Sequence, residues 1–407
     1  GQECPAHQAH ARAASGPVGG TRVKVPLLDL KRTYSDLSGE IARSLDEVLR
    51  SQLMILGRNV TAFEENLARL CGVRFAVGCG SGSDALLLAL TALDVGPGDE
   101  VVTTPFTFFA TAGSIARTGA TPVFADIDPE TFNLRPECVE AAVTDRTKVI
   151  LPVHLYGQSA DMEGILEVAG RRGLPVVEDA AQAIGATYHG RPCGSMGTMG
   201  CLSFYPSKNL GAAGEAGAVL TSDETLAALV RSLRVHGADP GEPYVHRRVG
   251  FNSRLDEVQA VVLNVKMKHL SDWTDERRAL ASRYTEELSG LDGVTTPRLA
   301  PGCQHVWHQY VIRASRRDAL ATHLESRGVA SRVFYPVPMH LQECFRSLGG
   351  RPGDFPEAER ACAEVLSLPI FPGLTTDEQD HVCASIREFC ARGRSRARTS
   401  RNLGTTN

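Results

Sequence analysis

One lysine in a loop rich in hydroxyl and glycine residues, and one aspartate at the end of an apolar strand, are the residues best suited to chemistry. Lys208 lies in the segment Ser-Phe-Tyr-Pro-Ser-Lys-Asn-Leu-Gly, residues 203–211. Asp179 closes the segment Val-Val-Glu-Asp, residues 176–179. A lysine amine forms a Schiff base with an aldehyde, and a carboxylate keeps a pyridine nitrogen protonated so that the ring accepts electrons. The pair therefore predicts that the chain binds pyridoxal 5'-phosphate.

Two polar residues near this pair are predicted to hold the same cofactor. A carboxylate at the end of a buried strand needs a positive partner. A pyridinium nitrogen supplies one for Asp179, and a capping role or an arginine partner is the alternative interpretation. Gln182 follows three residues later and is expected to hydrogen-bond the phenolic oxygen of the cofactor. Ser203, five residues before Lys208, is expected to offer its hydroxyl to the phosphate.

A glycine- and serine-rich turn, Cys-Gly-Ser-Gly-Ser-Asp over residues 79–84, separates a predicted strand from a predicted helix. Glycine lets the backbone approach an anion, and the first amides of a helix are free to bind phosphate. Gly82 and Ser83 are therefore the predicted phosphate-binding residues, although any strand-to-helix turn uses these residue types. The G-x-G-x-x-G dinucleotide pattern is not satisfied, because residue 85 is Ala.

Three aromatic residues occur in the four positions from Phe106, in a chain that is only 6% aromatic. A ring at the carboxyl end of a strand can stack on a flat heteroaromatic group. We assign this role to Phe108, with core packing as the alternative for each of the three rings.

Short apolar runs alternate with helical patterns over residues 74–233, which predicts an α/β fold with a mostly parallel sheet covered on both faces. The expected strands are 74–77, 100–103, 121–125, 148–153, 175–178 and 217–220, and the expected helices between them are 83–90, 109–117 and 161–170. Residues 256–291 read as one long helical stretch. A smaller α+β region follows, with a strand at 310–312 and helices over 317–327 and 377–389.

Length and composition predict a soluble protein of two domains. The chain has 407 residues, 43% of them apolar and 22% charged, and a formal net charge of −4. This charge does not favour nucleic acid, and no apolar run is long enough to cross a membrane. The expected parts are a disordered leader (1–22), a large cofactor-binding domain (23–270), a small C-terminal domain (271–390) and a disordered basic tail (391–407).

The cysteines predict a reducing environment. There are 11 of them, an odd number, and none form a C-x-x-C pair. A disulfide framework and a zinc site are therefore not expected, nor is any other metal, and the predicted location is the cytoplasm. Five histidines could line a sugar or diphosphate pocket, although each alone is more typical of a structural or solvated residue: 154, 236, 246, 308 and 340.

Together these motifs resemble the DegT/StrS family of pyridoxal phosphate-dependent sugar aminotransferases. The resemblance covers residues 25–389. Further matching segments are Pro-Leu-Leu-Asp-Leu (26–30), Met-Ile-Leu-Gly (54–57), Gly-Pro-Gly-Asp-Glu (96–100), Pro-Val-His-Leu-Tyr-Gly (152–157), Gly-Phe-Asn-Ser-Arg-Leu-Asp (250–256), Tyr-Pro-Val-Pro (335–338) and Leu-Ser-Leu-Pro (366–369). One departure is Glu215, which stands where the family usually has aspartate.

The resemblance implies fold type I, a homodimer with shared active sites, and L-glutamate as the amino donor. It implies that Asn252 reaches the phosphate of the neighbouring subunit. It also implies that Arg254 holds the donor carboxylate, a task that suits a guanidinium. His308 and Tyr335 are expected to contact the substrate.

At the level of subgroups, the segment Asn-Ser-Arg-Leu-Asp-Glu (252–257), with Lys266 and Trp273, resembles members that act on carbon 3 of dTDP-linked 3-keto-6-deoxyhexoses. The implied product is an amino-deoxysugar for a secondary metabolite, such as an antibiotic, or for a cell-surface glycan. Action on carbon 4 and cyclitol amination are the alternative activities. A degenerate cofactor-binding regulator is the alternative outside enzymes, and it would be expected to lack Lys208 or Asp179.

Overall fold

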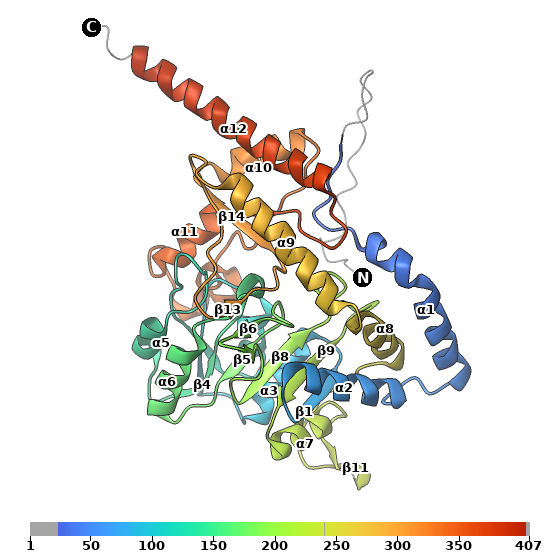
Figure 1. Cartoon of the computed structure of the whole chain (residues 1–407). Coiled ribbons are helices and arrows are strands. Elements are labelled where there is room, and N and C mark those ends of the chain that lie inside the picture. Colours follow the sequence, from blue (N-terminus) through green and yellow to red (C-terminus); the bar gives the residue numbers. More distant parts are fainter. Residues whose placement is uncertain (1–22, 240, 404–407) are drawn as a thin grey trace.

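The computed structural model describes residues 23–239 and 241–403, as an α/β body with a smaller helix-and-sheet unit above it (Figure 1). The expected leader, residues 1–22, lies outside this range. In the described residues no helix is both long enough and apolar enough to span a bilayer.

A mixed sheet forms the centre of the large domain. Its two parts, β3-β2-β4 and β5-β8-β9-β1, are joined by parallel bridges between β4 and the segment of β5. The strands are β1 (Phe75–Cys79), β2 (Glu100–Thr103), β3 (Thr121–Phe124), β4 (Thr147–Leu151), β5 (Val177–Asp179), β8 (Met199–Ser203) and β9 (Gly217–Thr221). All pairings are parallel except those of β9, which runs antiparallel to both β8 and β1. The α/β fold of type I is confirmed.

The reversal of β9 has a local cause that matters for the site. Strand β8 ends at Ser203, and residues 204–216 return the chain without a helix. A strand that follows a loop rather than a helical crossover pairs antiparallel with its predecessor. Lys208 therefore lies on this return loop, beside the carboxyl end of β8.

Helices cover both faces of the sheet, as continuous apolar strands require. Neighbouring residues of one strand face opposite sides, so Val101 packs with one apolar cluster and Val102 with the other. The Val101 face carries α3 (Gly82–Ala92), α4 (Ala110–Arg117) and α7 (Glu224–Leu233), and the Val102 face carries α2 (Arg58–Cys71), α5 (Pro136–Ala142), α6 (Met162–Arg172) and α8 (Glu257–Met267). Helix α1 (Leu30–Ser51) lies along α8.

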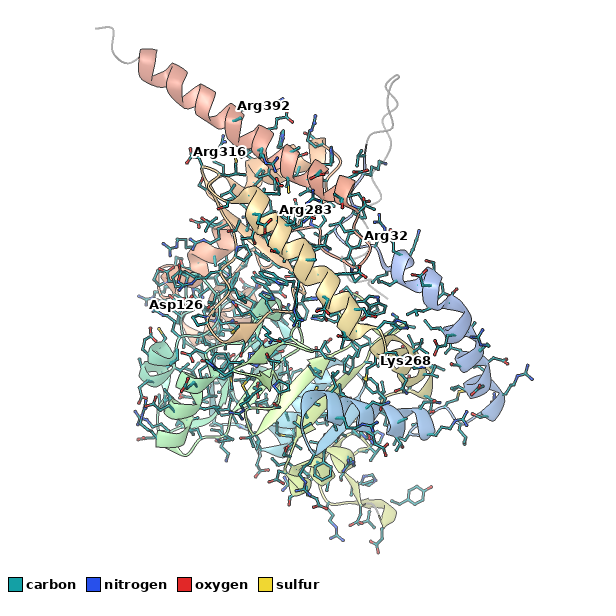
Figure 2. All side chains as sticks on the ribbon, in the orientation of Figure 1. Arg32, Asp126, Lys268, Arg283, Arg316 and Arg392 are labelled. Atoms are coloured by element: carbon teal, nitrogen blue, oxygen red, sulfur yellow. The ribbon has the colours of Figure 1, made fainter. Side chains whose placement is uncertain are left out.

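The small domain is an antiparallel sheet, β12 (Val294–Thr295), β14 (Tyr310–Ala314) and β15 (Val365–Leu368), packed against α9 (Leu270–Leu288), α10 (Arg317–Ser326) and α12 (Thr376–Leu403). Arg283 on α9 pairs with Asp380 on α12 at 2.6 Å, and Arg32 on α1 pairs with Glu378 at 2.6 Å. Figure 2 labels the two arginines. The remaining elements are η1 (Leu155–Gly157), β6 (Thr187–Tyr188), β7 (Arg191–Pro192), β10 (Ala238–Asp239), β11 (Glu242–His246), β13 (Cys303–Gln304), η2 (Met339–Leu341), η3 (Glu343–Leu348) and α11 (Pro356–Glu364).

Three boundaries differ from those expected. Val25 bridges Val329 and packs in the small-domain core, so the large domain does not begin at residue 23. The stretch 256–291 is two helices, α8 and α9, which serve different cores although their apolar spacing continues across the break. Helix α12 continues to Leu403, into the tail expected to be disordered, because arginine and alanine favour helix.

Candidate active site

Asp179 is a buried carboxylate at the end of β5, with a side chain held by two donors. The residue is 5% exposed, and its Oδ2 accepts a hydrogen bond from the Thr111 hydroxyl at 2.8 Å. Its Oδ1 accepts from the amide of Ala181 at 3.2 Å, and the Thr107 hydroxyl lies 2.9 Å from that of Thr111. Burial raises the pKa of Asp179, and these hydrogen bonds oppose the rise. The carboxylate is fixed in orientation and suited to a cationic partner.

Lys208 lies in a tightly folded loop, and its amine interacts electrostatically with this carboxylate. Its amide donates to the carbonyl of Tyr205 at 2.8 Å, and a Cβ at Gly211 would lie 2.3 Å from the carbonyl oxygen of Pro206. Burial lowers the pKa of the Lys208 amine to about 8, and the charge of Asp179 opposes this effect. The two predicted catalytic residues therefore lie within electrostatic reach of each other.

The lowered pKa of Lys208 predicts a pH-dependent reactivity in the protein without cofactor. At pH 8 about half of the Lys208 amine is neutral, against under about 1% for an ordinary lysine amine. Competitive labelling with acetic anhydride, read by peptide mass spectrometry, should give a midpoint near pH 8 for Lys208. The amine of an unstructured reference peptide with a single lysine should give a midpoint about two pH units higher. In Asp179→Asn the Lys208 midpoint should fall further, because the carboxylate raises the pKa of Lys208. Equal midpoints for Lys208 and the reference peptide would contradict this prediction.

The turn over residues 79–84 forms the N-terminus of α3, as predicted. Ser81 caps the helix by accepting from the Asp84 amide at 3.1 Å. The amides of Gly82 and Ser83 belong to the first turn, where a helix leaves its N–H groups without intrahelical partners. A Cβ at Gly82 would lie only 2.5 Å from the Cβ of Ser203. The three predicted phosphate-binding residues are thus brought together, at a helix end that favours an anion.

Three more predicted residues, Gln182, Tyr335 and Phe108, lie next to one another. Gln182 Nε2 donates to the Tyr335 hydroxyl at 3.2 Å, and Gln182 Oε1 accepts from the Tyr156 amide at 2.6 Å. The rings of Phe108 and Tyr335 have centroids 6.0 Å apart. Phe108 is 56% exposed, so this ring is not a core residue and a flat ligand could cover it.

His308 is linked to the Lys208 loop by Asn209, a residue that was not predicted from the sequence. Its Nδ1 is 3.1 Å from Oδ1 of Asn209, the residue after Lys208. Burial, followed by the positive charge of Lys208, lowers the pKa of His308 well below its usual value.

Asn252 and Arg254 are bonded to each other, Arg254 Nη2 donating to Asn252 Oδ1 at 2.7 Å. Asn252 is exposed, and the buried Ser253 between the two residues anchors the segment to the phosphate turn. The Ser253 hydroxyl accepts from the Gly80 amide at 3.0 Å and lies 2.9 Å from Asp84 Oδ2. The roles implied for Asn252 and Arg254 remain predictions. Ser253 was missed, although it stands inside the quoted motif.

Two of the remaining predicted histidines, His340 and His246, have hydrogen-bond partners within the protein. His340 Nε2 lies 3.2 Å from a carboxylate oxygen of Glu359, and His246 Nδ1 lies 3.0 Å from the carbonyl oxygen of His236. The unusual Glu215 is exposed, so its additional methylene does not crowd the loop.

Glu178, next to Asp179, points into the opposite layer and holds the fold. It is fully buried with His154, whose Nδ1 accepts from the Ala160 amide and whose Nε2 therefore donates to Glu178 at 2.8 Å. Glu178 also accepts from the amides of residues 194, 196 and 197. His154 is thus a structural histidine.

We expect Glu178→Gln to destabilise the protein by roughly 2–4 kcal/mol, because its amide group would face N–H donors inside the core. The free energy of unfolding in urea measures the loss. Glu167→Gln is the control, since its pair with Arg171 is exposed to solvent and should contribute little to stability. Equal effects of the two substitutions would contradict the structural role.

A lysine of lowered pKa, a fixed buried carboxylate and a helix N-terminus fit a phosphorylated pyridine aldehyde. If that cofactor binds here, Lys208 would meet its aldehyde, Asp179 its ring nitrogen, and Gly82, Ser83 and Ser203 its phosphate. This combination on an α/β fold of type I defines a pyridoxal phosphate-dependent transaminase. The model of the DegT/DnrJ/EryC1/StrS aminotransferase family matches residues 35–387, and the chain belongs to this family.

Known relatives match nearly the whole chain. A protein of Geobacillus stearothermophilus named pleiotropic regulatory protein is 54% identical over 90% of this chain and 99% of its own length. The dTDP-3-amino-3,4,6-trideoxy-alpha-D-glucose transaminase of Streptomyces venezuelae is 44% identical over 91% of this chain and 97% of its own length. The crystal structure of S. venezuelae DesV in complex with a ketimine intermediate, 44% identical, has a TM-score of 0.88 and covers 90% of this chain and 98% of that one.

Proposed function

We propose that this protein transfers the amino group of L-glutamate to carbon 3 of a dTDP-linked 3-keto-6-deoxyhexose and so forms a dTDP-linked 3-amino sugar. The observation that carries the proposal is a buried lysine, Lys208, whose amine has a pKa of about 8 and which interacts electrostatically with the fixed carboxylate of Asp179. Support for the substrate comes from the S. venezuelae transaminase, whose name specifies a 3-amino dTDP-sugar. The names of other relatives specify UDP- or GDP-linked sugars, so a nucleotide-linked sugar is the common element.

Each residue of the site has a definite task in this reaction. When bound, pyridoxal phosphate supplies an electron sink for the electron pair left by removal of a proton from carbon. Lys208 Nζ attaches the cofactor and, once released, accepts the proton from the α-carbon of glutamate. In the second half-reaction the same amine delivers a proton to carbon 3 of the sugar. A neutral amine at working pH can accept that proton, and the lowered pKa makes a large fraction of Lys208 neutral.

The remaining residues hold charge in place. Asp179 keeps the ring nitrogen protonated through a carboxylate that Thr111 and the Ala181 amide fix in orientation. The amides of Gly82 and Ser83, with the Ser203 hydroxyl, would bind the phosphate. Phe108 would cover one face of the ring, and Gln182 would hydrogen-bond its phenolic oxygen.

We further propose that the active unit is a homodimer. Asn252 is exposed and joined to Arg254, which leaves this segment available to a second copy. In that arrangement Asn252 contacts the phosphate of the partner, and Arg254 binds the donor carboxylate through two parallel hydrogen bonds. His308 and Tyr335 contact the substrate.

The name of the G. stearothermophilus relative raises a regulatory role as a second candidate. A regulator without catalysis would have no need of a lysine with a lowered pKa facing a buried acid, and this chain has both. We therefore favour the transaminase.

The test is a substrate panel. The purified protein, loaded with cofactor, is incubated with ¹⁵N-glutamate and with dTDP- and UDP-linked 3-keto and 4-keto sugars, and products are read by mass. We expect ¹⁵N in the dTDP-linked 3-amino sugar first. Exclusive labelling of 4-amino sugars would overturn carbon 3, and exchange with glutamate but with no sugar would point to a cyclitol or another ketone.

A further inference from the structure

The amide side chain of Asn209 determines which ring nitrogen of His308 carries the proton. Asn209 is 8% exposed, and its Nδ2 donates to the carbonyl oxygen of Val306 at 2.9 Å. A carbonyl oxygen only accepts, so the amide nitrogen must face Val306 and Oδ1 must face His308. Oδ1 also only accepts, and it lies 3.1 Å from His308 Nδ1. The hydrogen of the imidazole therefore lies on Nδ1.

The other ring nitrogen, Nε2, is consequently an acceptor. Burial, and to a smaller extent the charge of Lys208, lowers the pKa of His308 well below the usual histidine value, which favours the neutral ring. A neutral imidazole with its hydrogen on Nδ1 has only a lone pair on Nε2. The ring can receive a hydrogen bond from a ligand but cannot donate one.

The backbone around His308 is fixed from three directions. The Val306 amide donates to the Gly157 carbonyl at 3.0 Å, and Arg277 Nη1 donates to the Trp307 carbonyl at 3.0 Å. Gly157 has φ +105°, and a Cβ there would lie 3.1 Å from the His308 amide nitrogen. The loop is packed too closely for the ring to be carried elsewhere by a shift of its backbone.

We propose that His308 Nε2 accepts a hydrogen bond from a hydroxyl on a carbon next to the keto carbon of the sugar, and that Asn209 is the positioning residue that makes it an acceptor. This inference rests on the proposed function, and it names the group that the site selects. A site built to pair with a hydroxyl rejects an analogue without it, because the buried acceptor is then left unpaired. A carbonyl or carboxylate oxygen at that position would meet a second acceptor.

The kinetic test compares His308→Asn with wild type on the keto sugar and on its 2-deoxy and 4-deoxy analogues. Asparagine reaches the position of Nδ1, so the bond to Asn209 is kept while the Nε2 acceptor is removed. Wild type should prefer the hydroxylated sugar over one of the analogues by about 10- to 100-fold in kcat/KM, and His308→Asn should lose this preference. His305→Asn, in the same loop, is the control and should keep it. An unchanged preference in His308→Asn overturns the proposal.

A second measurement needs no turnover. In cofactor-free protein labelled with ¹⁵N-histidine, the ring nitrogens of His308 are identified by the signals that vanish in His308→Asn. We expect the hydrogen on Nδ1 in wild type and a mixture of both forms in Asn209→Leu, which removes the acceptor. A hydrogen on Nε2 in wild type overturns the proposal.

The transaminase activity and the hydroxyl preference can be tested separately. A wild-type protein that exchanges no amine with glutamate would overturn the proposed function and this inference with it. A wild type that aminates the keto sugar and its deoxy analogues equally well would overturn this inference alone.

Discussion

Lys208→Ala is expected to lower turnover by at least about 10³-fold and to remove the visible absorption that a lysine-bound cofactor gives. The substitution removes both the attachment point and the amine that moves the proton. The nearby His308 is a poor replacement, because burial lowers the pKa of its imidazole well below the usual value. Steady-state kinetics with glutamate and an absorption spectrum measure the two effects.

Lys268→Ala is the matched control for this experiment. Lys268 is an exposed surface residue that pairs with Glu40, so its removal should leave activity and spectrum at the wild-type level (Figure 2). Turnover by Lys208→Ala close to that of wild type would refute the assignment of the catalytic lysine.

Asp179→Asn is expected to fold normally and to lower turnover by about 10³-fold or more. An amide can still accept the hydrogen bond from the Ala181 amide and pair with the Thr111 hydroxyl, which can turn to accept. It cannot keep a pyridine nitrogen protonated, so the ring loses its capacity to hold electrons. Cofactor affinity should fall as well, because a buried charge pair is replaced by a neutral contact.

Without cofactor, Asp179→Asn should leave the thermal stability of the protein unchanged or raise it. Burial raises the folded-state pKa of Asp179, so the folded state binds this proton more tightly than the unfolded state. Stability then falls as pH rises from the unfolded pKa through the folded pKa, and the loss remains above that window. At pH 8 the cofactor-free Asp179→Asn protein should therefore melt at or above the wild-type temperature, and added cofactor should stabilise wild type more than the variant. A large loss of stability without cofactor would instead make Asp179 a structural residue.

Much of the fold could be predicted, since its strands and helices carry local signals. The strand at Glu100–Thr103 and the helix over Gly82–Ala92 were expected nearly where they lie. The break between α8 and α9 had no such signal, because apolar spacing continues across it while the two helices enter different cores. The position of Val25 could not be predicted either, since its partner Val329 is distant in the chain.

Some residues of the site could be predicted from the sequence in the same way, and others could not. The types of residue needed for the chemistry were visible in short segments, because a strand end, a helix N-terminus and a loop lysine are each local features. Thr111, Ser253 and Asn209 were not identified, although each bonds directly to a predicted residue or to the phosphate turn. Their types alone are common in turns and helices, and only their partners give them a role.

The sequence by itself therefore determined the class of chemistry and the cofactor, and it predicts the catalytic pair, since these depend on side-chain type and on local backbone form. The tertiary structure alone decided the burial, the hydrogen bonding and the protonation of each group. Distant segments meet at one edge of the sheet. Their meeting buries Lys208, brings the Thr111 hydroxyl to Asp179, and fixes the position of the proton on His308. Order along the chain does not specify such contacts; the order of strands in the sheet does, because it fixes which strand ends and loops become neighbours.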